Sequence, residues 1–172
     1  MRKGCGYSVP FPGGRAVPGE EEYPKAWDKP AICTWRTFVD PAKLKDFASR
    51  YTAAWCSQNA ASVASFFSPT GSLKINDGPA SLGRAAITGA AQGFMTAFPD
   101  LVVALDRLAV DGGEATYHWI LTGTNTGPGG TGRPVRITGY EQWRFGADGL
   151  IAESLGRFDA ADYQRQLAQA TE

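Results

Sequence analysis

In the first half of the chain the hydrophobic positions repeat at intervals of three and four residues, the spacing of a helix with one buried face. The sequence predicts that the first helix starts at Asp40-Pro41, where an N-cap aspartate precedes a proline in the first turn. A short second helix is predicted over 60–67, ending at Ser68-Pro69. The buried faces of the first and third helices consist of Leu44, Phe47, Ala48, Tyr51 and Trp55, and of Ile87, Ala90, Ala91, Phe94 and Phe98.

The period changes to two in the second half of the chain, as it does in β-strands. Turn sequences at 111–113 and 148–149 and a glycine-rich loop at 127–132 divide this half into segments. After a short strand near 72–75, four long strands are predicted near 101–110, 114–124, 134–145 and 149–158. Asp159 is expected to cap a last helix. Helices followed by an antiparallel meander indicate an α+β domain.

The length of 172 residues suits a single domain, which we predict at 39–172. Residues 1–38 are rich in Gly and Pro and show neither period, so we expect an irregular N-terminal arm. The arm holds six aromatic residues, more than a solvated tail needs. Parts of it are therefore expected to pack on the domain or on a partner subunit.

Charge and cysteine content exclude several classes of protein. The 17 basic and 17 acidic side chains cancel, and no basic run interleaves with aromatics, so a nucleic-acid binder is not expected. Without an apolar run typical of a signal peptide or a bilayer span, we expect a cytoplasmic protein that does not enter a membrane. Three widely spaced cysteines fit neither a disulfide framework nor a zinc site, and we expect no metal and no cofactor.

The predicted strand at 134–145 carries the most informative residue. Alternation places Glu141 on its apolar side, together with Ile137, Gly139 and Trp143. A carboxyl there would be desolvated and its pKa raised, so that it could donate a hydrogen bond to a ligand oxygen. The alternatives are that the strand twists or that Glu141 pairs with an arginine.

Three other residues have a structural and a functional interpretation. His118 lies mid-strand in YHWIL and is either a structural hydrogen-bonding side chain or a proton shuttle. Asp77 either caps a tight turn or folds over the mouth of a pocket. Tyr51, on the buried face of the first helix, needs a partner for its hydroxyl, which is either a backbone carbonyl or a ligand.

The second half of the chain resembles the SnoaL-like branch of the nuclear transport factor two-like superfamily, which includes polyketide cyclases and ketosteroid isomerases. The resemblance covers roughly 42–167 and is carried by FPDL, GTNTGPGGTGRPVRITG, WRF, DGLI and RFD. It implies a cone-shaped, curved antiparallel sheet with three N-terminal helices around an apolar pocket. It also implies a small hydrophobic ligand and, because members bury one face of the sheet in a dimer, a homodimer.

Residue by residue, the resemblance places the phenolic donor of the isomerases on Tyr51 and their protonated acid on Glu141. The aspartate base of the isomerases falls on Ile75, and the acid that related cyclases and epoxide hydrolases use on the last strand falls on Gly156. Neither residue can move a proton, which leaves Asp77 and His118 as candidates for that task. The residues expected to contact the ligand are Trp55, Phe94, Phe98, Trp119, Ile137, Trp143, Gly156 and Phe158.

Three functions fit these residues. The first is an isomerase or cyclase that moves protons on a cyclic ketone or polyketide-like substrate without a metal or a covalent intermediate. The second is a binding module that holds the same kind of ligand without catalysis. The third is a dimeric interaction subunit.

Overall fold

The computed structural model describes residues 40–111 and 114–168 of the chain. The arm predicted for residues 1–38 lies outside the described residues. In chain order the elements are α1 (Pro41–Cys56), α2 (Ala60–Ala64), β1 (Phe67–Ile75), β2 (Ser81–Leu82), α3 (Gly83–Ala97), β3 (Val102–Asp111), β4 (Glu114–Thr124), β5 (Pro134–Phe145), β6 (Ile151–Phe158) and α4 (Ala160–Ala168). No helix in these ranges is both long enough and apolar enough to cross a membrane.

The first helix begins where the sequence predicts. Asp40 is its N-cap and accepts a hydrogen bond from the Ala42 N–H at 2.9 Å. The strand β1 differs from the prediction, because it starts at Phe67 and not near residue 72. Its pairing with β6 is irregular between Phe67 and Ser72, the interval that holds Pro69. Proline offers no N–H to a ladder, so it interrupts the pairing without ending the strand.

All six strands form one sheet in the order β2-β1-β6-β5-β4-β3. The strands β3 to β6 pair antiparallel with their sequence neighbours, as the meander prediction requires. One pair differs from an all-antiparallel sheet, since β1 and β6 run parallel. The chain between these two strands contains a helix and four strands, which is more than enough length for a parallel return.

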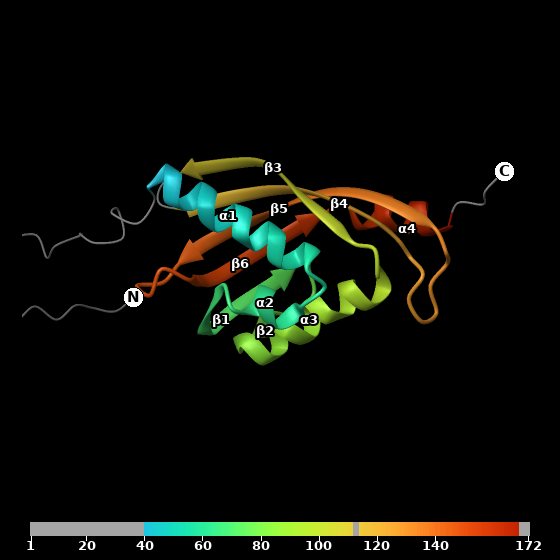
Figure 1. The fold of residues 1–172 in the computed structure, drawn as a ribbon, viewed down its shortest axis with the longest axis horizontal. Coiled ribbons are helices and arrows are strands. Elements are labelled where there is room, and N and C mark those ends of the chain that lie inside the picture. Colours follow the sequence, from blue (N-terminus) through green and yellow to red (C-terminus); the bar gives the residue numbers. More distant parts are fainter. Residues whose placement is uncertain (1–39, 112–113, 169–172) are drawn as a thin grey trace, which may run out of the picture. The chain divides into compact units, whose positions relative to one another are not determined.

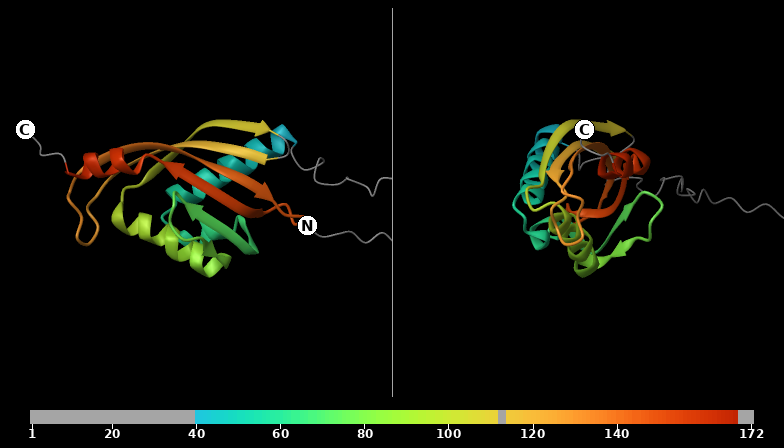
Figure 2. Two further views of the ribbon diagram at one scale, coloured as in Figure 1. Left: turned by 180° about the vertical axis from the view of Figure 1, so that it is seen from behind. Right: turned by 90° about the vertical axis from the view of Figure 1, so that its right-hand side faces the viewer.

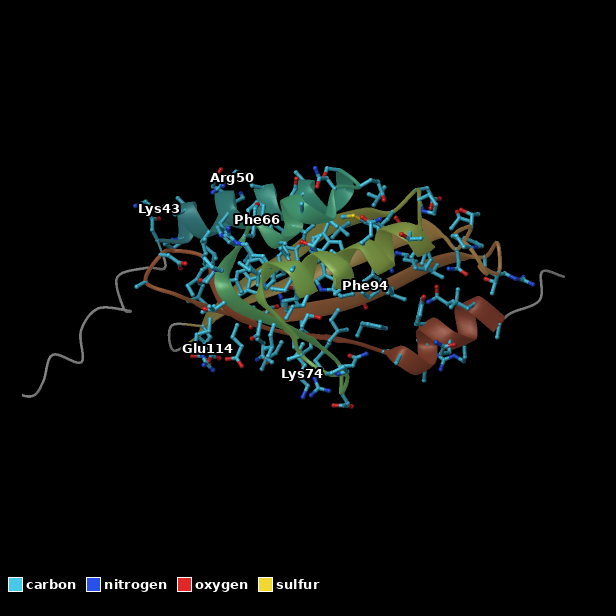
Figure 3. The ribbon with its side chains drawn as sticks, turned by 90° about the horizontal axis from the view of Figure 1, so that it is seen from below. Lys43, Arg50, Phe66, Lys74, Phe94 and Glu114 are labelled. Carbon is cyan, nitrogen blue, oxygen red and sulfur yellow. The ribbon has the colours of Figure 1, made fainter. Side chains whose placement is uncertain are left out.

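The sheet is strongly curved, and α1, α2 and α3 lie on its concave side (Figures 1 and 2). The helix α1 packs against β3, whereas α3 packs against β1 and α2. Figure 3 shows side chains filling much of the space between these helices and the strands. The α+β fold predicted from the sequence, a curved sheet with three helices on one side, is therefore confirmed.

An aromatic cluster holds α1 to the inner face of the sheet. The rings of Tyr117 and Trp143 stack with centroids 4.7 Å apart and planes 13° apart. Tyr51 of α1 contacts both rings edge-on, with centroid distances of 5.6 and 5.1 Å. All three side chains are almost completely buried. Edge-to-face and offset stacked pairs are favourable beyond the area they bury, so this cluster fixes the distance between α1 and the strands β4 and β5.

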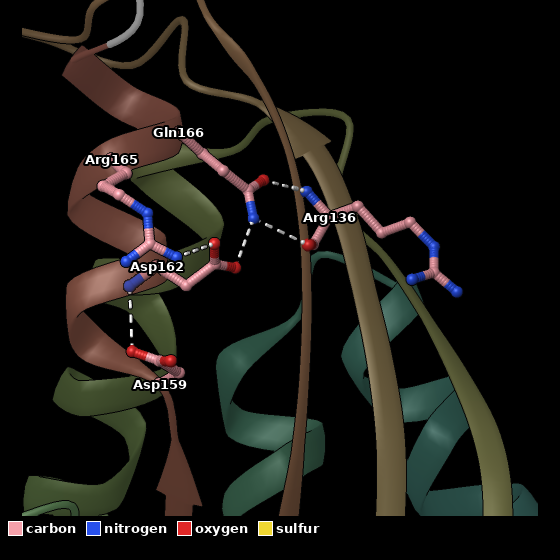
Figure 4. A network of polar contacts seen from close by, with 5 residues as sticks. All are labelled: Arg136, Asp159, Asp162, Arg165 and Gln166. Carbon is pink, nitrogen blue, oxygen red and sulfur yellow. Dashed lines mark hydrogen bonds and ion pairs between the residues drawn. The ribbon is translucent and has the colours of Figure 1, made fainter.

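A side chain of the last helix, α4, hydrogen-bonds to the backbone of β5 (Figure 4). Gln166 accepts a hydrogen bond from the Arg136 N–H at 2.7 Å and donates one to the Arg136 carbonyl oxygen at 3.0 Å. The amide of Gln166 therefore pairs with the strand as a neighbouring strand would. Asp159 caps α4 as predicted, because its Oδ1 accepts from the Asp162 N–H at 2.8 Å.

We expect Gln166→Ala to release α4 from β5. Two hydrogen bonds to the strand are lost, at about 0.5–1.5 kcal/mol each. The backbone amides of α4 should then exchange with deuterium faster than in the unchanged protein, while those of β4 keep their rates. The matched control is Gln164→Ala on the exposed side of the same helix. Equal exchange of α4 in both variants would contradict the role of Gln166.

Candidate functional site

A row of directly paired residues crosses the inner face of the sheet. Tyr117 on β4 faces Glu141 on β5, which faces Gly156 on β6, which faces Ile75 on β1. All four line one cavity of about 530 Å³, a volume that includes its open mouth. The other lining residues are Trp55, Leu73, Phe94, Val103, Trp119, Leu121, Arg157 and Phe158. The wall is apolar except for a few polar groups, as is usual in sites that bind small molecules.

Glu141 is the acid of this cavity, and three neutral side chains hydrogen-bond to it. Its Oε2 accepts from Trp143 Nε1 at 2.9 Å and from Ser154 Oγ at 2.7 Å. Tyr51 Oη donates to the same carboxyl, 3.1 Å from Oε2 and 3.3 Å from Oε1. The predicted burial of Glu141 is observed, at 7% exposed, and its partners here are not arginines. Most of the donors meet one oxygen, so Oε1 is the less engaged of the two.

Burial raises the pKa of the Glu141 carboxyl above its ordinary value of 4.5, although the bonds from Trp143, Ser154 and Tyr51 act in the opposite direction. The cause is that a desolvated carboxylate loses its hydration, and neutral donors replace only part of it. The protonated acid is favoured as a result. Because Oε2 already accepts the three bonds, Oε1 is the oxygen best placed to carry the proton.

Tyr51 is close to this carboxyl but does not line the cavity. Its side chain is fully buried and its hydroxyl donates to Glu141. Burial raises the pKa of Tyr51 well above 10, and the negative charge of ionised Glu141 adds to this effect. The prediction of Tyr51 as a donor to a ligand therefore needs correction, because its one hydroxyl proton is used by Glu141. Tyr51 orients the acid.

Tyr117 lines the cavity, although the sequence did not single it out as a site residue. Its hydroxyl lies 2.7 Å from Thr52 Oγ1, which in turn donates to the Ala48 carbonyl oxygen at 2.8 Å. Since the single hydroxyl proton of Thr52 is used there, Tyr117 is the donor to Thr52. The alternation of YHWIL would have selected Tyr117 if the register of β4 had been known.

His118 lies on the opposite face of β4 from Tyr117 and Trp119. It pairs with Tyr140, and its Nε2 is 3.1 Å from Nη2 of Arg107. A guanidinium can only donate, so Nε2 is the acceptor in this contact. His118 does not line the cavity, and the predicted shuttle role is corrected on this ground: successive side chains of a strand point to opposite faces.

Asp77 lies in the turn after β1 with 90% of its side chain exposed. Its Oδ1 accepts from Arg157 Nη1 at 2.9 Å, and Arg157 lines the cavity. Asp77 is therefore connected to the cavity only through Arg157 and does not reach its interior. The prediction that Asp77 moves a proton inside the pocket is corrected for this reason.

Of the eight residues predicted to contact a ligand, the structure brings five to the cavity wall. These are Trp55, Phe94, Trp119, Gly156 and Phe158. Phe94 extends from α3 (Figure 3) and contacts Trp55 of α1 edge-on, with ring centroids 6.2 Å apart. The remaining three, Phe98, Ile137 and Trp143, are buried in the core and are corrected to packing residues. Trp143 affects the site only by its bond to Glu141.

Solved structures with the same fold include several from bacteria. A SnoaL-like polyketide cyclase from Jannaschia sp., itself assigned provisionally, is 18% identical, with 76% of this chain and 94% of that chain covered and a TM-score of 0.67. A hypothetical protein with a ketosteroid isomerase-like fold from Catenulispora acidiphila, in complex with trimethylamine, is 16% identical (73% and 94% covered, TM-score 0.64).

A third structure is SalBIII, an epoxide hydrolase/cyclase-like enzyme with a role in pyran ring formation in the polyether salinomycin. It is 18% identical, with 72% of this chain and 95% of that chain covered and a TM-score of 0.60. At such identities the likeness establishes a shared fold. No curated protein sequence matches the chain.

Sequence comparison gives the narrower assignment. The model of the SnoaL-like domain matches residues 48–154, which is more than half of the chain. The matched range begins in α1 and ends in β6, and it contains Tyr51, Glu141 and Ser154. The resemblance found in the sequence is thereby confirmed, and the chain belongs to the SnoaL-like domain family.

Proposed function

We propose that this protein binds a small, largely apolar molecule with an oxygen next to Glu141, and that it catalyses an isomerisation or ring closure of that molecule by moving one proton. The substrate class is a cyclic ketone or a polyketide-like compound. The observation that carries the proposal is the buried carboxyl of Glu141, which lines an apolar cavity while its partners bond mainly to one oxygen. The proposal retains the homodimer and the cytoplasmic location expected from the sequence.

The chemistry requires Glu141 to act twice. As the protonated acid it donates from Oε1 to the substrate oxygen and transfers its proton when negative charge develops there. In ring closure the resulting carboxylate takes the proton of the new oxonium. In isomerisation it takes a proton from the carbon next to the carbonyl, and Glu141 then protonates the distant carbon of the dienol while recovering the proton from the dienol hydroxyl. The proton count of the protein is unchanged after the cycle. A pKa raised by burial suits both steps, because acid and carboxylate then lie closer in free energy near neutral pH.

The cyclase-type relatives support ring closure as the reaction. The Jannaschia protein is described as a SnoaL-like polyketide cyclase, and SalBIII has a role in pyran ring formation. Ring closure by an internal hydroxyl needs no second protein base, since Glu141 itself recovers the proton. That matches a cavity in which Ile75 and Gly156 occupy the positions where the resemblance would place a base or a second acid.

The same two residues favour a second candidate function, which is binding without catalysis. With Ile75 and Gly156 in those positions, Glu141 is the only carboxylic acid among the described residues that line the cavity. A module that only binds would use Glu141 as a hydrogen-bond donor and the apolar wall for affinity. The experiment below separates the two functions.

We expect Glu141→Gln to abolish turnover while leaving binding measurable. Glutamine keeps the shape of the side chain and an oxygen for the three donors, but it has no proton to transfer. The rate of converting cyclohex-3-enone to the conjugated enone, or of closing a 4,5-epoxy alcohol, should fall about 100-fold or more. Turnover is followed by absorbance or by chromatography.

The matched control is Glu153→Gln, which changes an acid that pairs with Arg144 on the neighbouring strand. It should keep the full rate. If Glu141→Gln turns over as fast as the control, Glu141 is not the acid. If the unchanged protein binds these compounds but converts none of them, the binding module is the correct function.

The raised pKa of Glu141 also predicts how stability depends on pH. The folded protein holds a proton that the unfolded chain, with a pKa near the ordinary 4.5, releases. The stabilisation of the folded state by this bound proton is therefore complete below about pH 4.5. It is lost as the pH rises through the pKa of Glu141 in the folded protein. The free energy of unfolding of the unchanged protein, minus that of Glu141→Gln, should fall as pH increases from about 4.5. Urea titrations at a series of pH values measure it.

Other groups do not produce this signal. The two hydroxyls that face the carboxyl, on Tyr51 and Tyr117, have pKa values raised above 10 by burial and stay neutral across this range. A difference that stays constant from acid to neutral pH would show that Glu141 is ionised in the folded protein.

The glycine opposite Glu141 should control the space for the ligand. A Cβ at Gly156 would lie 3.7 Å from Glu141 Cγ and 3.8 Å from Ile75 Cγ1, both ordinary contacts. Gly156→Ala is therefore expected to fold with a stability within about 1 kcal/mol of the original. It should weaken the binding of a one-ring ketone, because the methyl group occupies the cavity. Gly89→Ala, at a site with open space on α3, is the control and should leave binding unchanged.

A further inference from the structure

The cavity contains a second donor besides Glu141, the indole N–H of Trp119. Nε1 of Trp119 is covered from solvent and has no hydrogen-bond partner among the residues that the structure describes. Buried donors are nearly always paired, so an unpaired one needs an explanation, such as an acceptor supplied by a bound molecule. Trp119 lines the cavity, so a ligand bound there can supply the acceptor.

The second indole at this site is already paired. Trp143 lies on β5 and its Nε1 donates to Glu141 Oε2 at 2.9 Å. That bond is internal to the protein, and Trp143 does not line the cavity. A third indole, that of Trp55, also lines the cavity. Among the described residues only Nε1 of Trp119 is buried without a hydrogen-bond partner.

The position of Trp119 depends on a glycine on the next strand. Trp119 and Gly139 are directly paired across β4 and β5. A Cβ on Gly139 would collide with the indole ring of Trp119 and with the carbonyl oxygen of Arg157. The ring therefore lies over the backbone of β5, at a place where no larger residue fits without moving it.

The register also relates this donor to the acid. Glu141 is two residues beyond Gly139 on the same strand, so Trp119 and Glu141 are diagonal neighbours on one face of the sheet. Diagonal neighbours have backbones about 7–8 Å apart, which long side chains bridge. Two donors of this kind can bind two oxygens of one small molecule.

We propose that Trp119 donates a hydrogen bond from Nε1 to the ligand, and that the ligand carries a second acceptor oxygen in addition to the one at Glu141. The ligand class is thus a small apolar ring compound with two acceptor oxygens, such as a keto ether, a diketone or a keto lactone. The inference rests on the proposed function, because it takes the same cavity as the ligand site.

The test uses the full chain labelled with ¹⁵N-tryptophan, whose five indoles give separate N–H signals. Trp119→Phe identifies the signal of Trp119. The probes are tetrahydropyran-4-one, which has two acceptor oxygens, and methylenecyclohexane, which has a similar ring and none. The Trp119 proton should shift downfield with the keto ether and not with the hydrocarbon. Trp119→Phe should weaken binding of the keto ether about 3- to 10-fold and binding of the hydrocarbon less than about 2-fold.

The signal of Trp143 separates failure of this inference from failure of the proposed function, because its N–H is bonded to Glu141 and reports on that carboxyl. If Trp143 responds to the keto ether while Trp119 does not, the Trp119 inference is wrong and the ligand site stands. An equal shift of Trp119 with both probes indicates ring contact alone and also overturns the inference. If neither signal responds to either probe, the cavity is not the ligand site and both proposals fail.

Discussion

The burial of one carboxyl, Glu141, is the constraint on which the site depends. A desolvated acid is costly unless its oxygens are hydrogen-bonded, and here the donors come from α1, β5 and β6. These three elements must therefore be in register with one another before Glu141 is satisfied. The aromatic cluster of Tyr51, Tyr117 and Trp143 provides that register. Two of its members, Tyr51 and Trp143, also donate hydrogen bonds to the acid. Packing and polar pairing thus specify the same arrangement.

That arrangement leaves space where the chemistry needs it. On both sides of Glu141 the inner face of the sheet carries a glycine, Gly139 on its own strand and Gly156 on the next. At Gly139 the missing side chain is replaced by the ring of Trp119, whereas at Gly156 it leaves part of the cavity empty. One glycine therefore positions a donor and the other makes room for a ligand. Neither glycine has a backbone conformation that a larger residue would avoid. Both therefore matter because they lack a side chain that would occupy space.

Local pattern predicted the elements well because each depends on nearby residues. Asp40 and Asp159 cap their helices, and strict alternation was enough to place Glu141 on the inner side of β5. The start of β1 was missed because Pro69 reads as a break in the sequence, while the strand only loses pairing there. Pattern describes single elements reliably and their irregularities poorly.

Long-range pairing explains what the sequence could not determine about the site. The inward face of β4 depends on its register with β5, and the loop between them leaves that register free in the sequence. Tyr117 was therefore overlooked, and His118 was considered for a role inside the cavity. The partner of Tyr51, Glu141, is 90 positions away, and no local rule connects them.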